Sequence, residues 1–258
     1  MAAFIGDPAP PPPGGREPGS WYAGPVPECH TTGSLTFVRL TAAHAELDYE
    51  ALMASRGYLR RWSDSDWPAD DFTVEENREE LAWHDDEHEA RIAFTYSVLD
   101  PTRSRVLGCL YVRPLRDMLL TRGVEPPEGS SWPAADAPSA RGWVRRDVSE
   151  ETERRFLAET LKWLTGPDWA FPLLWWAAAS CDIRQLALLD ELGWTRELRV
   201  TGARPGLEWV LRRAAASYFT VTERYEDFVK ACRASAGATA RSRQLPAEGS
   251  HVFTLYRV

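Results

Sequence analysis

The sequence predicts a mixed α/β fold of the α+β kind, in which a twisted sheet of about six or seven strands carries helices on both faces. Three observations indicate this fold. Short β-rich runs alternate with segments of helical spacing between residues 35 and 213. The run PLLWWAAAS at 172–180 is continuously apolar, as in a strand that is buried on both faces. The chain has 258 residues, 44% of them hydrophobic, which is enough for a sizeable core.

The first elements are expected to be one strand and two helices. LTFVRLT at 35–41 alternates apolar and polar residues like a half-buried strand. AHAELDYEALMAS at 43–55 then has its apolar residues at helical spacing. A second helix is predicted over 73–88, with Thr73 as the N-cap and Glu76 as its capping-box partner.

A β-hairpin and a further strand are expected next. The β-rich runs at 91–100 and 105–114 flank the turn-forming segment from Asp100 to Ser104. Residues 121–140 hold four prolines and predict an exposed loop. The segment GWVRR at 142–146 predicts the strand that follows this loop.

The last part of the sheet is expected to alternate helices and strands. A helix is predicted over 150–165, started by a capping signal at Asp147 with Glu150 and stopped by Gly166 and Pro167. The apolar run at 172–180 comes next. DIRQLALLDEL at 182–192 predicts a helix that ends at Gly193, and the segments 195–202 and 207–213 predict two more strands.

The composition divides the chain into three parts. Eight of the 19 prolines and five of the 17 glycines fall within residues 1–27, so residues 1–33 are expected to be a disordered leader. Residues 34–213 are expected to form the folded domain. Residues 214–258 are a C-terminal extension to which the sequence assigns no role.

Charge and cysteine usage exclude several classes of protein. The net charge of −8 argues against a nucleic-acid partner. No apolar run reaches the roughly 18 residues of a membrane span, and the N-terminus lacks a signal-peptide pattern, so a cytoplasmic location without membrane contact is expected. The four cysteines form no C-x-x-C pair, which disfavours a zinc knuckle.

Two segments carry a resemblance to a known family. GWVRRDVSEETERRFLAETLKWL at 142–164 resembles the cofactor-holding strand, loop and helix of the GCN5-related N-acetyltransferases (GNAT). CDIRQLALLDELGW at 181–194 is similar to the N-x-x-A-x-x-L-Y-x-x-x-G-F helix of that family. The resemblance covers about 180 residues by element order. It implies an acyl-CoA-dependent N-acyltransferase, in which an amine of a small molecule or protein attacks the thioester of acetyl-CoA directly.

The resemblance also implies a cofactor site with a degenerate pyrophosphate loop. When Val144 is aligned with the valine of V-x-x-x-x-[QR]-x-x-G-x-[GA], Thr152 takes the place of the first glycine. Main-chain pairing with the pantetheine arm is expected from Trp143 and Val144, and phosphate contacts are expected from arginine side chains. The expected cofactor-binding residues are Trp143, Val144, Arg145, Arg146, Ser149, Arg154 and Asp182.

The sequence does not identify the catalytic residues. Leu189 stands where many family members have a tyrosine that protonates the CoA thiolate, and leucine has no proton to donate. Tyr96, Tyr111 and Ser180 are candidates for a general base. The alternative function is a catalytically inactive binding or regulatory module with the same fold, and the sequence leaves a homodimer open.

Two further clusters of side chains indicate other possible ligands. Tryptophans lie beside aspartates in a segment that could bind a cationic amine, at Trp62, Trp67, Trp83, Asp64, Asp66, Asp70 and Asp71. The motif HDDEH at 84–88 places two imidazoles one helical turn apart, as in some zinc hydrolases. A third protein ligand is not evident, so no metal is expected.

Overall fold

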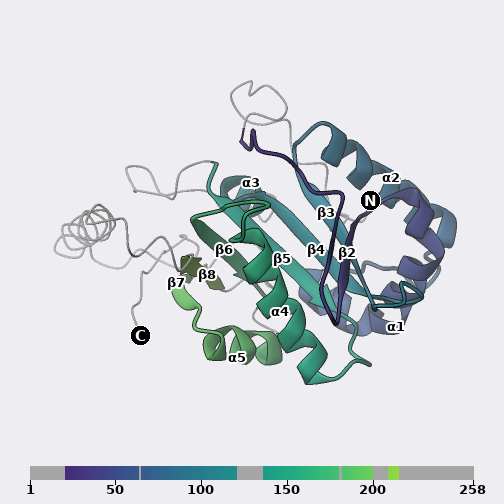
Figure 1. The fold of residues 1–258 in the computed structure, drawn as a ribbon. Coiled ribbons are helices and arrows are strands. Elements are labelled where there is room, and N and C mark those ends of the chain that lie inside the picture. Colours follow the sequence, from purple (N-terminus) through teal and green to yellow (C-terminus); the bar gives the residue numbers. More distant parts are fainter. Residues whose placement is uncertain (1–20, 64, 121–135, 180–181, 200–208, 215–258) are drawn as a thin grey trace, which may run out of the picture.

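A single sheet of eight strands forms the centre of the molecule (Figure 1). The computed structural model describes residues 21–63, 65–120, 136–179, 182–199 and 209–214. The strand order is β1-β2-β3-β4-β5-β6-β8-β7. The strands are β1 (Cys29–Thr31), β2 (Thr36–Arg39), β3 (Phe94–Leu99), β4 (Val106–Pro114), β5 (Pro138–Val144), β6 (Leu173–Ala178), β7 (Thr195–Arg199) and β8 (Trp209–Ala214).

Helices cover both faces of this sheet, which confirms the predicted mixed α/β fold. The helices are α1 (Ala45–Ser63), α2 (Val74–Glu89), α3 (Leu115–Leu120), α4 (Glu150–Leu164) and α5 (Ile183–Glu191), with a 3-10 turn at Ala42–His44. One face packs against α4 and α5 through residues such as Phe156 and Leu189. The other packs against α1 and α2 through residues such as Leu52 and Leu81.

The alternation of side chains along the central strands separates the two cores. Leu110 and Val112 of β4 belong to the core under α4 and α5, whereas Cys109 and Tyr111 belong to the core under α1 and α2. In the same way, Val144 of β5 faces α4 and Trp143 faces α1. The neighbours Trp143 and Val144 therefore line opposite sides of the sheet.

The one parallel pairing within the described strands is the one that positions the site. All other neighbouring strands are antiparallel. The parallel strands β5 and β6 pair at Ser139 with Trp175 and at Ala140 with Trp176. No backbone pairing joins the two strands beyond these residues, toward their C-terminal ends and the start of α4, and we call this unpaired stretch the opening between β5 and β6.

Local sequence signals explain several element boundaries. The Thr73 hydroxyl accepts a hydrogen bond from the N–H of Glu76, while the Glu76 carboxylate accepts one from the N–H of Thr73 at 2.8 Å, so the predicted capping box begins α2. In the turn of the hairpin β3–β4, Asp100 Oδ1 accepts hydrogen bonds from the N–H groups of Ser104 and Arg105, both at 2.8 Å. Gly193 follows α5 with a φ of 76°, a conformation that glycine adopts without steric cost.

The structure differs from the sequence-based expectations in three places. Residues 29–31 of the expected leader form β1 on the edge of the sheet. Trp21 and Tyr22 also pack against the core, because their rings contact Phe94 and Phe171. Helix α3 was not predicted. Ser149, and not Asp147, caps α4, because the Asp147 carboxylate is bound by Arg145. Residues 1–20 and 215–258 lie outside the described part of the chain.

Candidate functional site

The opening between β5 and β6 is bridged by a glutamine side chain. The N–H of Arg145 donates to the carbonyl of Leu107 in β4, and successive peptide groups of a strand point to opposite sides. The main chain of Gly142 and Val144 therefore faces β6. Gln185 of α5 donates to the Gly142 carbonyl at 3.2 Å and accepts a hydrogen bond from the indole of Trp176 at 3.0 Å.

The N-terminus of α4, next to this opening, is capped and acidic. The hydroxyl of Ser149 accepts a hydrogen bond from the N–H of Thr152 at 3.2 Å, so this amide already has a partner. Glu150, Glu151 and Glu153 lie in the first turn, where carboxylates suit the positive end of the helix dipole. Glu150 and Glu151 are more than half exposed, whereas Glu153 is fully buried.

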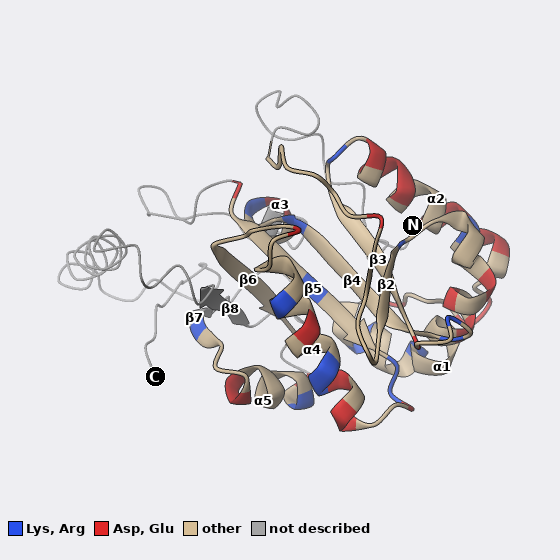
Figure 2. Cartoon of the chain, in the orientation of Figure 1, with Lys and Arg blue, Asp and Glu red and all other residues tan. Residues whose placement is uncertain are grey.

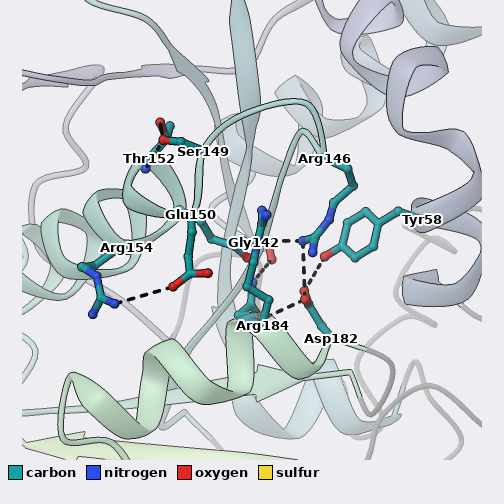
Figure 3. A network of polar contacts seen from close by, with 11 residues as sticks. Tyr58, Gly142, Arg146, Ser149, Glu150, Thr152, Arg154, Asp182 and Arg184 are labelled. Carbon is teal, nitrogen blue, oxygen red and sulfur yellow. Dashed lines mark hydrogen bonds and ion pairs between the residues drawn. The ribbon is translucent and has the colours of Figure 1, made fainter.

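Glu153 belongs to a network of charged side chains at the opening, of which Figure 3 shows Arg146, Asp182 and Arg184. Arg146 lies 3.5 Å from the carboxylates of both Glu153 and Asp182. Arg184 forms a short ion pair with Glu153. Asp182 also accepts a hydrogen bond from the hydroxyl of Tyr58 at 2.5 Å, and the guanidinium of Arg146 stacks on the Tyr58 ring at 4.4 Å.

Two atoms of this network lack partners within the described residues. Oε1 of Glu153 and Nη2 of Arg184 are buried and form no hydrogen bond. Burial, with a smaller contribution from the Asp182 charge, raises the pKa of Glu153 above its usual value. When Glu153 holds a proton, Arg146 and Arg184 together outweigh the single charge of Asp182, and the network becomes attractive to an anion.

A cavity of about 560 Å³ lies on the other side of the sheet, under α1 and α2. We call it the α1–α2 cavity. Its aromatic wall comes from the loop between the two helices, from α2, and from β4 and β5. This wall consists of Trp67, Phe72, Trp83, Tyr111 and Trp143. Within the wall, the indole of Trp143 donates to the hydroxyl of Tyr111 at 3.3 Å.

Five carboxylates line the cavity, at Asp48, Asp66, Glu76, Glu79 and Glu80. Asp48 accepts a hydrogen bond from the side-chain amide of Asn77 at 3.2 Å, and burial raises its pKa to about 7. Glu80 accepts hydrogen bonds from the indole of Trp67, and burial raises its pKa to about 8. Apolar surroundings thus favour the protonated form of both acids until a cation is present.

His84 also lines the cavity and is held by a buried ion pair. Its Nδ1 lies 3.4 Å from Oε2 of Glu87, which Arg113 contacts at 3.1 Å. Burial lowers the pKa of His84 although Glu87 raises it, so the imidazole is neutral near pH 7. Among the described residues, none forms a hydrogen bond with Nε2 of His84.

The fold of this chain is similar to that of several solved structures. No protein-family model matches the chain, and no curated protein matches its sequence. Solved structures do match. A ribosomal-protein-S5-alanine acetyltransferase from Vibrio fischeri has a TM-score of 0.53 at 13% identity, covering 74% of this chain and 98% of its own. RimJ of Mycobacterium smegmatis, solved with CoA-disulfide, has a TM-score of 0.52 at 13% identity, with 71% and 83% covered.

A third match is the aminoglycoside acetyltransferase AAC(6')-Ib in complex with coenzyme A, with a TM-score of 0.51 at 12% identity, covering 73% of this chain and 99% of its own. The chain has the GNAT fold. At this level of identity the likeness establishes the architecture alone. Any function must be argued from the residues that this chain places on the two sides of β5.

Within this GNAT fold, some of the residues expected at the cofactor lie at the opening, and the others contact different parts of the protein. Arg146 and Asp182 belong to the network at the opening, Ser149 caps α4, and the main chain of Val144 faces the opening. The main chain of Trp143 faces β4 instead. Arg145 is bound by Asp147 and Glu50, and Arg154 pairs with Glu191 on the surface.

The aromatic and acidic cluster singled out in the sequence is only partly assembled at the cavity. Trp67, Trp83 and Asp66 line it. Trp62 instead stacks on the guanidinium of Arg141 at 3.6 Å, and Asp70 pairs with Arg60 at 2.9 Å. Asp71 is not among the lining residues, and Asp64 lies outside the described part of the chain.

The three candidates for a general base have different surroundings in the GNAT fold. Tyr96 donates to the carbonyl of Pro27 at 2.9 Å, and burial raises its pKa. Tyr111 lines the cavity, and burial raises its pKa well above the usual value. Ser180 lies outside the described residues.

The two histidines of the HDDEH motif have separate environments. His84 faces the cavity, whereas His88 contacts the rings of Phe94 and Tyr96. In the part of the chain that the structure describes, no group of three or more His, Cys, Asp or Glu side chains is placed to hold a metal ion. None of the described helices is long and apolar enough to cross a membrane.

Several residues of both parts of the site are not evident from the sequence. Gln185 and Arg184 at the opening, and Asp48 and Glu80 at the cavity, were not singled out. One signal was available for the buried acids. Asp48 stands on the apolar stripe of α1 with Ala45 and Leu52, where an unpaired carboxylate is unusual.

Proposed function

We propose that this protein is an acyl-CoA-dependent N-acyltransferase. The observation that carries the proposal is the placement of Trp143 and Val144. Trp143 forms part of the wall of the α1–α2 cavity, and the main chain of the next residue, Val144, faces the opening between β5 and β6. An acceptor in the cavity and an acyl group at the opening would therefore meet across β5, which supplies the proximity that acyl transfer requires.

Acyl-CoA fits the opening through side chains more readily than through helix amides. The amide of Thr152 is taken by Ser149, but Arg146 and Arg184 both lie at the opening, and Nη2 of Arg184 is a buried donor without a partner among the described residues. Guanidinium groups bind phosphate oxygens through paired hydrogen bonds. The diphosphate would replace Glu153 as the partner of the two guanidinium groups. The pantetheine arm would form hydrogen bonds with the main chain of Val144.

The acceptor would be an amine whose nitrogen attacks the thioester carbon. A protonated amine must first lose a proton, which His84 can accept because its imidazole is neutral and Nε2 has no hydrogen-bond partner among the described residues. The C–N bond then forms as the C–S bond breaks, and the second proton of the nitrogen leaves with the sulfur as CoA thiol. Glu87 stabilises the imidazolium.

Calorimetric titration with acetyl-CoA tests the donor site. We expect micromolar binding that the Arg146→Gln/Arg184→Gln variant weakens by at least about tenfold, the effect of losing charge-assisted hydrogen bonds. Arg155→Gln is the matched control, because Arg155 lies on the exposed side of α4 and pairs only with Glu151 among the described residues. Release of CoA thiol in the presence of amines, with the amide product identified by mass, tests the transfer.

A second candidate function is a catalytically inactive binding module. Gln185 supports it, because this side chain already occupies the Gly142 carbonyl that faces the opening. Leu189, fully buried where the resemblance implies a proton-donating tyrosine, supports it as well. Absence of acetyl-CoA binding at millimolar concentration, in a protein with a cooperative melting transition, would favour this candidate over the enzyme.

A further inference from the structure

The α1–α2 cavity combines acidic groups with apolar walls. Its described lining residues include five carboxylates and neither lysine nor arginine. Acidic residues are also frequent along α2, which forms one side of the cavity (Figure 2). An anionic ligand would meet repulsion from every charged group there, whereas a cation would be attracted. The sign of the ligand charge follows from this lining.

Two of the carboxylates, one buried and one half-buried, are placed to select a cation rather than merely to attract one. The side chain of Asp48 belongs to a residue that is only 4% exposed. Its Oδ2 accepts the hydrogen bond from Asn77, no described residue forms a hydrogen bond with Oδ1, and Asp48 is one of the residues that line the cavity. Glu80 is oriented by the indole of Trp67 at 2.9 Å and 3.1 Å.

The two acids also act on each other. The charge of Asp48 contributes to the raised pKa of Glu80, after burial, as does the charge of Glu76. A bound ammonium group would remove this mutual repulsion and would supply hydrogen-bond donors to both carboxylates. A single positive charge in the cavity would therefore offset the unfavourable interaction between the charges of Asp48 and Glu80.

The other lining residues determine which kind of uncharged group the ligand carries beside its cation. Trp67, Phe72, Trp83 and Trp143 present aromatic surface, and Leu40 and Leu52 present aliphatic surface. Such walls stabilise a cation by contact with ring faces and bury an apolar body, but they offer few partners for hydroxyl groups. A ligand that carries hydroxyl or ammonium groups along its whole length would have to place some of them against these apolar walls without hydrogen bonds.

We propose that the α1–α2 cavity binds a protonated primary amine on a single aromatic or aliphatic body, with its ammonium group between Asp48 and Glu80. As the acyl acceptor this ligand rests on the proposed function, whereas its binding does not require acyl-CoA. The cavity volume of about 560 Å³ lies within the range of sites that enclose drug-sized molecules. An amine with a phenyl ring and a short alkyl chain is a suitable probe.

The experiment compares charged and uncharged probes on the same protein without acyl-CoA. We would titrate the chain with 4-phenylbutylamine and with 4-phenylbutan-1-ol, which has the same body and no charge, by calorimetry near pH 7.5. The variants are Asp48→Asn and Glu80→Gln, which keep a hydrogen-bonding group. Glu75→Gln, at an exposed position of α2, is the matched control. Thermal melting of each variant establishes that it is folded.

We expect the amine to bind at least about tenfold more tightly than the alcohol, and each cavity variant to lose about the same factor while the control does not. Equal binding of amine and alcohol would overturn the proposal, as would tighter binding of spermidine than of 4-phenylbutylamine. Amine binding that depends on Asp48 and Glu80, in a chain that does not bind acetyl-CoA, would support the cavity proposal and contradict the proposed transferase.

Discussion

The indole N–H of Trp67 donates to both carboxylate oxygens of Glu80, at 2.9 Å and 3.1 Å. Trp67 lies between α1 and α2, and Glu80 lies in the second turn of α2, so the bond connects two sides of the α1–α2 cavity. The donor favours the ionised acid, but burial has the larger effect and raises the pKa of Glu80 to about 8. This carboxyl group is therefore held in place before a ligand arrives.

The first prediction concerns stability and pH. Because the pKa of Glu80 is about 8 in the folded chain and about 4.5 when unfolded, the folded state retains a proton that the unfolded state loses. The stabilising contribution is fully present below pH 4.5 and is lost as pH rises to 8. We expect Glu80→Gln to become more stable than wild type over this window, by up to about 5 kcal/mol for the full pKa shift and by less because the half-buried carboxyl group is partly screened by solvent.

Urea denaturation of both chains between pH 5 and pH 9 measures this difference. The titration of groups that do not interact with Glu80 cancels, whereas the charge of Asp48, which acts on Glu80, contributes to the trend. The exposed Glu75→Gln variant should show no such trend. A constant offset between wild type and Glu80→Gln across the window would contradict the prediction, because it would mean that Glu80 titrates alike in both states.

Most elements of the fold could be predicted because their signals are local. The capping box at Thr73, the turn at Asp100 and the helix stop at Gly193 all act within a few residues of each other. Strand β1 could not, because its sequence is polar and it is held by the edge of β2 across the chain. Ser149 replaced Asp147 as the cap because Arg145 binds Asp147, a contact that the capping pattern does not report.

The site was harder to predict because its members come from distant segments. Arg146 was expected at the cofactor and does lie at the opening, but its partners Glu153 and Asp182 depend on how α4 and α5 pack. Gln185 reaches Gly142 over 43 positions of sequence. Asp48 gains its raised pKa from burial alone, which only the packing of α1 against the sheet creates.

The second prediction tests the close contact between β4 and β5. A Cβ atom on Gly108 would lie 2.1 Å from the carbonyl oxygen of Trp143, a distance that the two paired strands cannot accommodate without moving apart. We expect Gly108→Ala to lower the free energy of unfolding by about 3 kcal/mol in urea denaturation.

Gly57→Ala is the matched control for this substitution. Gly57 lies inside α1, and a Cβ atom there would meet nothing within 4 Å. Alanine stabilises a helix relative to glycine, so this variant should gain up to about 1 kcal/mol. If Gly108→Ala were as stable as Gly57→Ala, the tight register of β4 and β5 would be incorrect.

The third prediction concerns the acid at the opening. In the proposed function Glu153 competes with a diphosphate for Arg146 and Arg184. Glu153→Gln removes this charge and should tighten acetyl-CoA binding by about tenfold in calorimetry. It should also lower the free energy of unfolding by about 2 kcal/mol, because two guanidinium groups lose their buried counter-charge.

The control is Glu159→Gln on the same helix, two turns further from its N-terminus, which should change neither quantity. Weaker acetyl-CoA binding in Glu153→Gln would indicate that this carboxylate organises the site rather than competing for it. The competition between Glu153 and the diphosphate would then be abandoned.

The last prediction separates binding from proton transfer at His84. If Nε2 accepts the proton of the amine, His84→Gln should lower kcat by about a hundredfold and leave the KM of the amine nearly unchanged. Burial lowers the pKa of His84, so the wild-type rate should fall only at a pH below the usual range of histidine, and this acidic limb should vanish in the variant. Glu87→Gln should move the limb to still lower pH, because Glu87 raises the His84 pKa. A rise in KM with unchanged kcat would assign His84 to acceptor binding and leave proton removal to water.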